Sequence, residues 1–142
     1  MYVIDASVYA SLAVKDQFYN ISRRFLAKSR SLKCVTLDLA LIEAFNVLWK
    51  HVYLLKRIPI NYYLEISTML ERIFENSVVK VYNAARECEN AIHISVKYGI
   101  TVYDAVYVSL AEKLGYKLVS FDEKLKNRLK ESELESIIYI LR

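Results

Sequence analysis

Five short apolar runs, separated by longer segments with helical spacing, constrain most strongly what this 142-residue chain can fold into. The runs are rich in Val, Ile and Tyr and lack polar alternation, a pattern typical of strands buried on both faces of a parallel sheet. They span residues 2–4, 33–37, 78–82, 117–121 and 137–141. Strands that alternate with helices predict an α/β fold with a mainly parallel central sheet.

Predicted helices occupy the intervals between these runs. We expect two helices within 7–30, with a break near residues 15 and 16, and single helices at 38–55, 59–74, 83–98, 103–114 and 123–131. Asp38 and Asn83 are placed to cap the helices that follow them. Gly99 and Gly115 are placed to end the helices before them, since glycine accepts a left-handed C-cap conformation. Because no linker or repeat interrupts the pattern, a single domain covering residues 1–142 is expected.

Three of these helices carry distinct apolar patterns. The helix at 103–114 is apolar on nearly every side, so we expect it to be buried in the centre of the fold. The helices at 38–55 and 59–74 are amphipathic, and their apolar positions are expected to face the core. These positions are Leu41, Ile42, Phe45, Leu48, Trp49, Val52, Leu55, Leu64, Met69, Leu70 and Ile73.

Composition fits a folded protein in a reducing compartment. Hydrophobic residues make up 55% of the chain and charged residues 25%, which excludes a disordered tail. Cys34 and Cys88 lie in apolar stretches without metal-ligand spacing, so both are expected to be buried free thiols, and His51 and His93 suggest no zinc site. The first run lacks a basic leader, and no stretch of about 18 uncharged apolar residues occurs. We therefore expect no membrane span and a cytoplasmic location.

Aspartates follow apolar runs at three places. Asp5 and Asp122 end two predicted strands, and Asp104 opens the buried helix. In an open parallel sheet, ligands bind outside the carboxyl ends of the strands, so these three side chains are expected to converge. Glu43 lies about one turn into its helix, with Asn46 three residues further on the same face. The sequence thus predicts four carboxylates at one edge of the sheet.

Four carboxylates in one place repel one another unless a cation joins them. Oxygen ligands without histidine or thiolate favour Mg²⁺ or Mn²⁺ over zinc, and such a site suits phosphodiester hydrolysis. Individual acids also have simpler interpretations. Asp122 could merely cap the helix that starts at residue 123, Glu43 could simply face water, Asp38 is better explained as a cap, and Asp16 as a cap or a solvated residue.

Four segments in order resemble the motifs of PIN-domain nucleases, and within them of the VapC-type toxins of toxin–antitoxin pairs. The segments are VIDAS at 3–7, LIEAFNVL at 41–48, TVYDAVYVSLA at 101–111 and LVSFDEKL at 118–125. Any one of them is a weak match. Together they keep the order of the family's motifs and span nearly the whole chain.

This resemblance implies a three-layer α/β/α sandwich around the parallel sheet. It implies that Mg²⁺ or Mn²⁺ is held by Asp5, Glu43, Asp104 and Asp122. Ser7 would contribute a hydroxyl near the metal or its water, and Ser120 keeps a hydroxyl where many relatives have threonine. Family members of this size typically cleave RNA, form homodimers and are held inactive by a small cognate antitoxin.

Basic residues flank the predicted site in two clusters and could steer RNA toward it, although ordinary solvated helix faces explain them equally well. The net charge of +4 permits an anionic partner without requiring one. The 12 tyrosines, including Tyr107, are expected mostly to fill the core or a dimer interface. The clusters contain Lys15, Arg23, Arg24, Lys28, Arg30 and Lys33, and Lys113, Lys117, Lys124, Lys126, Arg128 and Lys130.

Three other functions are compatible with acids at strand ends. An aspartate-based phosphotransfer domain would need a second acid two residues after Asp5, or a late basic residue after a strand. Position 7 is serine, and Lys117 stands at the start of its strand instead of after it. A non-catalytic module could use the acids only to hold a partner. A PIN nuclease could also serve RNA maturation instead of toxicity, and the sequence does not separate these two roles.

Overall fold

The computed structural model describes residues 1–142 and contains one five-stranded sheet. Its strands are β1 (Tyr2–Ile4), β2 (Val35–Leu37), β3 (Lys80–Tyr82), β4 (Lys117–Ser120) and β5 (Ile138–Ile140). They lie in the order β3-β2-β1-β4-β5, and every neighbouring pair is parallel. All five predicted strands are therefore present, although four are shorter than predicted.

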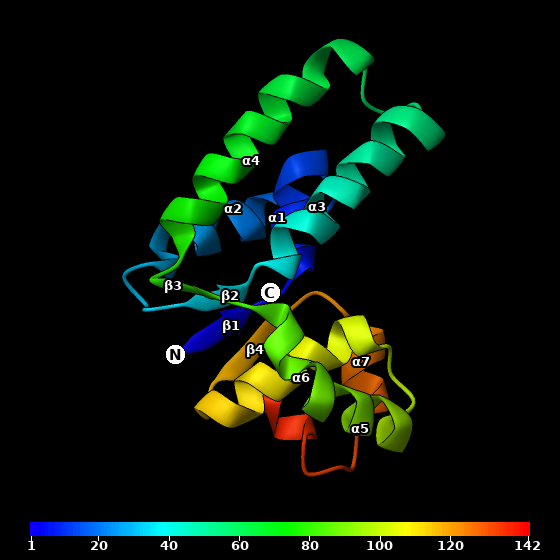
Figure 1. The fold of residues 1–142 in the computed structure, drawn as a ribbon. Helices are drawn as coiled ribbons and strands as arrows, with labels where there is room; N and C mark the ends of the chain where they lie inside the picture. Colours follow the sequence, from blue (N-terminus) through cyan, green and yellow to red (C-terminus); the bar gives the residue numbers. More distant parts are fainter.

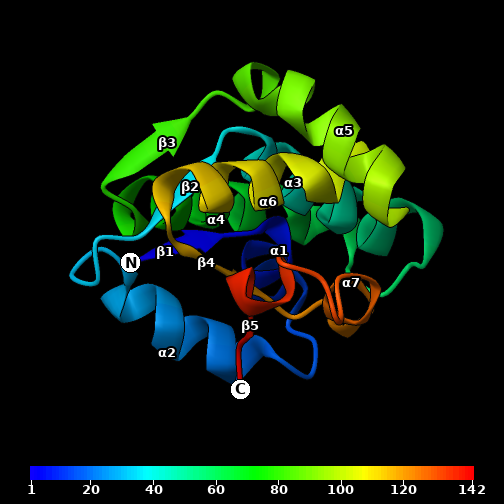
Figure 2. The same cartoon turned by 90° about the horizontal axis from the view of Figure 1, so that it is seen from below.

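Helices cover both faces of this sheet (Figures 1 and 2). On one face lie α1 (Ala6–Val14), α2 (Tyr19–Ser29), α3 (Leu39–Trp49) and α4 (Tyr63–Ser77). On the other lie α5 (Cys88–Tyr98) and α6 (Val102–Leu114), and α7 (Glu123–Arg128) contacts β5. Short 3₁₀ turns occur at Ile60–Tyr62, Ala84–Glu87 and Glu135–Ile137. The predicted three-layer α/β/α sandwich is confirmed.

The buried helix α6 forms where its sequence predicts it. All residues from 105 to 111 are buried, and α6 contacts both β1 and β4. Gly115 ends α6 with φ of 67°, and Gly99 ends α5 with φ of 68°. Both are left-handed conformations that glycine adopts without a steric penalty, as predicted. No helix in the protein combines the length and the apolar character needed to cross a bilayer.

Two local predictions are wrong. Asp38 does not cap α3, because its backbone is already helical (φ −57°, ψ −30°) and an N-cap carboxylate needs an extended backbone to reach the first turn. Its Oδ1 instead accepts a hydrogen bond from Ala84 N at 2.9 Å, which ties the start of α3 to the turn after β3. Cys34 is buried as predicted, but Cys88 is exposed, because the neighbouring Glu87 side chain is the one that turns inward.

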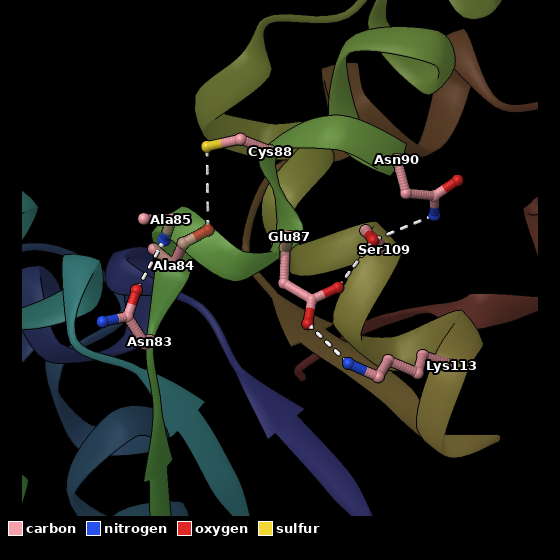
Figure 3. Close-up of polar contacts among 8 residues, drawn as sticks. All are labelled: Asn83, Ala84, Ala85, Glu87, Cys88, Asn90, Ser109 and Lys113. Atoms are coloured by element: carbon pink, nitrogen blue, oxygen red, sulfur yellow. Dashed lines mark hydrogen bonds and ion pairs between the residues drawn. The ribbon is translucent and has the colours of Figure 1, made fainter.

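A buried polar network joins α5 and the turn before it to α6 (Figure 3). The Glu87 carboxylate accepts hydrogen bonds from Ser109 Oγ at 2.8 Å and from Lys113 Nζ at 3.2 Å. Asn90 Nδ2 donates to Ser109 Oγ at 2.9 Å. A buried charge is tolerated only where such partners satisfy it, so the network fixes how α6 docks. It thereby helps to position Asp104, which lies in the first turn of α6.

The α3–α4 arm projects beyond the sheet (Figure 1). We use this name for residues 39–77, in which α3 continues as one π-helical segment over Lys50–Leu54 before α4 returns. Leu48 and Leu70 are buried as predicted. The predictions for Ile42, Trp49, Leu55, Leu64 and Met69 are wrong, since all five side chains are exposed. The predicted helices are amphipathic, but much of the arm extends beyond the sheet, so many of its apolar side chains have no sheet residues to pack against.

Candidate active site

A cavity of about 660 Å³ lies at the carboxyl ends of β1 and β4. In the sheet, β2 and β3 lie on one side of β1, whereas β4 and β5 lie on its other side. The carboxyl ends of β1 and β4 therefore flank the topological switch point, which is where open α/β sheets bind ligands. All four predicted acids line the cavity, together with Asn46 and Tyr107. The predicted convergence of side chains from four parts of the chain is confirmed.

Asp5 connects β1 to α1 and is held tightly. It is the N-cap of α1, and its Oδ1 accepts hydrogen bonds from Ser7 N at 2.8 Å and Ser7 Oγ at 2.5 Å. Burial raises the pKa of Asp5 to about 6. Hydrogen bonds from Ser120 and Ser7 oppose this rise, whereas the nearby Asp104 charge adds to it. Asp5 therefore has both a capping role and a carboxylate that is costly to ionise without a cation.

Ser7 and Ser120 already have partners within the protein. Ser7 Oγ donates to Asp5 and accepts from Phe121 N at 3.0 Å, which joins the start of α1 to the loop after β4. Ser120 is fully buried and its Oγ accepts from Asp122 N at 2.9 Å. Ser7 thus orients the Asp5 carboxylate, and Ser120 holds the backbone at Asp122. The resemblance implied a hydroxyl from Ser7 near the metal, but this geometry favours a positioning role.

Glu43 on α3 has one direct partner, Tyr107 on α6. The Tyr107 hydroxyl donates to Glu43 Oε1 at 2.8 Å. Burial raises the pKa of Glu43 to about 7, and the charges of Asp5 and Asp104 raise it further, while the Tyr107 hydrogen bond lowers it. Tyr107 is buried, as predicted, but its hydroxyl belongs to the site. The sequence could have indicated this role of Tyr107, because the residue lies three positions after Asp104 and so on the same face of the helix.

Asp104 and Asp122 complete the carboxylates of the cavity. Thr101, which the sequence alone did not single out, caps α6 by accepting from Asp104 N at 3.1 Å, and its hydroxyl donates to Asp104 Oδ2 at 3.0 Å. Burial, followed by the charge of Asp122, raises the pKa of Asp104. Asp122 Oδ1 accepts from Leu125 N at 2.9 Å and caps α7. The simpler interpretation of Asp122 as a cap is therefore correct, and its carboxylate still lines the cavity.

The donor set fits a hard divalent cation. No Lys, Arg or His lines the cavity, and none of its four acids forms a salt bridge. Their negative charge is therefore not balanced by the protein. No group of three or more Asp, Glu, His and Cys side chains already stands in metal-ligand geometry. Mg²⁺ and similar hard cations are usually bound through one or two carboxylates and keep several waters, which is a ligand set that the oxygen atoms of this cavity can supply.

Residues 2–130 match the family model described as PIN domain. The chain belongs to the PIN domain family. Among its relatives, Ribonuclease VapC3 of Pyrobaculum aerophilum is 39% identical over 127 residues, which cover 89% of this chain and 92% of VapC3. This PIN domain therefore has the family membership that its four motifs predicted.

Two solved structures share the fold of this PIN domain. The crystal structure of PAE2754 from Pyrobaculum aerophilum is 26% identical, with a TM-score of 0.68, and the match covers 92% of this chain and 87% of that one. VapC20 of Mycobacterium tuberculosis, described as a Sarcin-Ricin loop cleaving toxin, is 20% identical with a TM-score of 0.68. That match covers 89% of this chain and 94% of VapC20 and supports the fold alone.

Parts of the two basic clusters have structural roles. Arg30 donates to Val78 O at 2.6 Å, Lys113 pairs with Glu87, and Lys117 donates to Ser136 O. The side chains that remain exposed lie mainly on α2 and α7. Steering of RNA by these side chains stays a prediction.

Proposed function

We propose that this PIN domain is a Mg²⁺- or Mn²⁺-dependent endoribonuclease that hydrolyses RNA phosphodiester bonds and acts as the toxin of a toxin–antitoxin pair. The observation that carries the proposal is one cavity lined by four carboxylates and no basic side chain. The 39% identity to a protein named as a VapC ribonuclease supports RNA as the substrate and toxicity over RNA maturation. A cytoplasmic location agrees with an RNA substrate and with two free cysteines.

The residues of the site divide into two groups by what they touch. Asp5, Glu43, Asp104 and Asp122 would hold the cation. When bound, that ion supplies charge neutralisation at the phosphate and activation of a water molecule. Ser7, Thr101 and Tyr107 orient these carboxylates through the hydrogen bonds described above, and Ser120 holds the backbone of Asp122. The apolar walls, which include Leu39 and Val47, limit access of solvent to the carboxylates.

Cleavage of RNA by the purified protein tests this proposal. We expect cleavage with Mn²⁺, loss of cleavage with EDTA and recovery when Mn²⁺ is added in excess, because the carboxylates alone repel the phosphate. Asp5→Asn should lose the activity under all three conditions. Cleavage that continues at full rate in EDTA and in Asp5→Asn would falsify the proposal.

Tyr107→Phe tests the support of Glu43. The variant loses the only hydrogen bond to Glu43 and leaves the ring in place. We expect about a 10-fold lower cleavage rate, as for other residues that orient ligands. The free energy of unfolding should fall by about 1–3 kcal/mol, because the hydrogen bond is to a charged group. Tyr9→Phe removes another buried hydroxyl, bonded to Ser77 at 2.8 Å, and should lose stability but keep the cleavage rate. Equal cleavage rates in the two variants would contradict the assigned role.

We propose that the cognate antitoxin binds the α3–α4 arm. A groove of about 490 Å³ on the arm has almost entirely apolar walls, and Trp49, Tyr53 and Ile60 are 50%, 61% and 68% exposed. Lys56 and Arg57 at the end of the arm suit an amphipathic helix with acidic flanks. In a binding assay with a candidate antitoxin that forms a complex with the wild type, Trp49→Ser should lose the complex and keep cleavage. A complex of unchanged affinity would exclude the arm.

We also propose that the protein forms a homodimer, as the resemblance to VapC-type toxins implies. Light scattering should then give about twice the 16.6 kDa mass of one chain. A single-chain mass at every concentration measured would rule the dimer out.

A further inference from the structure

A second cavity opens beside the four carboxylates. It has a volume of about 360 Å³ and shares Ser7, Ala10, Val47 and Asp122 with the main cavity, so the two are adjacent. It extends toward the α1–α2 connection, which lies next to α7 in Figure 2. The side cavity is therefore within reach of a nucleotide attached to a phosphate at the carboxylates.

One wall of the side cavity is an aromatic pair, of which Phe121 also packs against the hydrophobic core. The rings of Phe18 and Phe121 are stacked, with centroids 4.3 Å apart and an interplanar angle of 10°. Both side chains are only half-buried, and Phe18 is not among the residues that pack against the hydrophobic core. A partly exposed, preformed aromatic stack is the kind of surface on which proteins place the bases of single-stranded RNA.

The polar groups of the side cavity are His51 and Asp16. His51 Nδ1 lies 3.0 Å from Val47 O, and because a carbonyl oxygen only accepts, Nδ1 is the donor of this hydrogen bond. Asp16 Oδ1 accepts from Ser11 Oγ at 2.5 Å and from Phe18 N at 2.9 Å, which leaves Oδ2 without a partner. Acceptors select bases that carry donors at their edge.

We infer that this side cavity is a nucleobase subsite for the nucleotide next to the scissile phosphate, with preference for a base that carries an exocyclic amino group. Phe18 and Phe121 provide the stacking surface, and Asp16 Oδ2 accepts from the amino group. The inference rests on the proposed ribonuclease function and adds its base preference. Uracil offers only N3–H, which lies between two carbonyl oxygens that repel a carboxylate, and therefore binds less well than cytosine.

Binding of hexaribonucleotides tests the subsite without cleavage. Fluorescence anisotropy with labelled oligo(C) and oligo(U) is measured on Asp104→Asn protein, which keeps the side cavity intact. Oligo(C) binds more tightly than oligo(U). In the Asp104→Asn protein, the further substitution Phe18→Leu weakens oligo(C) binding about 5- to 100-fold, the range expected for one lost base–aromatic stack. Phe18→Tyr in the same protein leaves the affinity for oligo(C) unchanged. Tyr139→Leu, a half-exposed aromatic residue of β5, is the control and leaves binding unchanged.

Asp16→Asn gives a second, independent readout. The amide keeps an oxygen for Ser11 and Phe18 but turns Oδ2 into a donor, so the preference shifts from oligo(C) toward oligo(U). A purely structural role of Asp16 would change both affinities equally. Unchanged binding in Phe18→Leu together with an unchanged preference in Asp16→Asn overturns the subsite, even if the wild-type protein cleaves RNA. If the protein neither binds nor cleaves RNA with Mn²⁺, the ribonuclease proposal fails as well.

Discussion

Asp104→Asn is expected to lower RNA cleavage by at least about 100-fold and to leave the protein folded. Asp104 is one of four carboxylates in a cavity without basic residues, so its loss removes a ligand and part of the field that attracts the cation. Its backbone N–H, which Thr101 caps, remains available in the variant. Initial cleavage rates with Mn²⁺ and circular dichroism spectra measure the two parts of this expectation.

Asp38→Asn is the matched control for this variant. Asp38 is also an aspartate at the start of a helix, but its carboxylate faces Ala84 and does not line the cavity. Its substitution should keep cleavage within about twofold of wild type, since a surface change away from special features has a small effect. Comparable cleavage losses in both variants would contradict a specific role of Asp104, because any aspartate near the start of a helix would then be needed for cleavage.

The stability of the protein without metal is expected to fall as the pH rises through the range in which Asp5 ionises. Burial raises the pKa of Asp5 from 3.8 to about 6, so the folded state binds a proton more tightly than the unfolded state. The contribution of protonated Asp5 to the free energy of unfolding is therefore complete below about pH 4 and is lost between about pH 4 and 6. A pKa difference of this size between the folded and unfolded states corresponds to about 3 kcal/mol at most. Glu43, with its pKa raised to about 7, extends the loss toward neutral pH.

Denaturant unfolding in EDTA at several pH values measures this effect. Asp5→Asn should be close to wild type near pH 4 and more stable than wild type at pH 8, because the neutral amide keeps the acceptor for Ser7 without the buried charge. Adding Mn²⁺ at pH 8 should stabilise the wild type more than the variant. A difference between the two proteins that does not change with pH would mean that Asp5 ionises freely in the folded state.

The sheet and the positions of the acids could be predicted because both depend on local patterns. The run Tyr2–Ile4 ends at Asp5, and a strand that ends at an acid fixes where the carboxylate lies once the sheet is parallel. Gly99 and Gly115 determine helix ends through backbone conformation alone. The four acids therefore converge in the structure as their positions along the chain indicated.

Features that depend on contacts between segments distant in the sequence could not be predicted from local patterns. The amphipathic pattern of the α3–α4 arm gives the side of each helix that is apolar, but not how far the sheet extends beneath it, so Trp49 and Leu64 are exposed. The partner of Asp38 lies 46 residues away, beyond any capping pattern. The hydrogen bond from Tyr107 to Glu43 spans 64 residues, and it exists only because the fold brings these two side chains of α6 and α3 into one cavity.

Anomalous diffraction from crystals of the protein soaked in Mn²⁺ tests most directly whether distant carboxylates share one cation. The account predicts a manganese peak inside the main cavity, about 2.1 Å from at least one carboxylate oxygen of Asp5 or Asp104, with water completing its coordination. A cavity that stays free of manganese at saturating concentration, or a peak bound only at other acids of the surface, would contradict it.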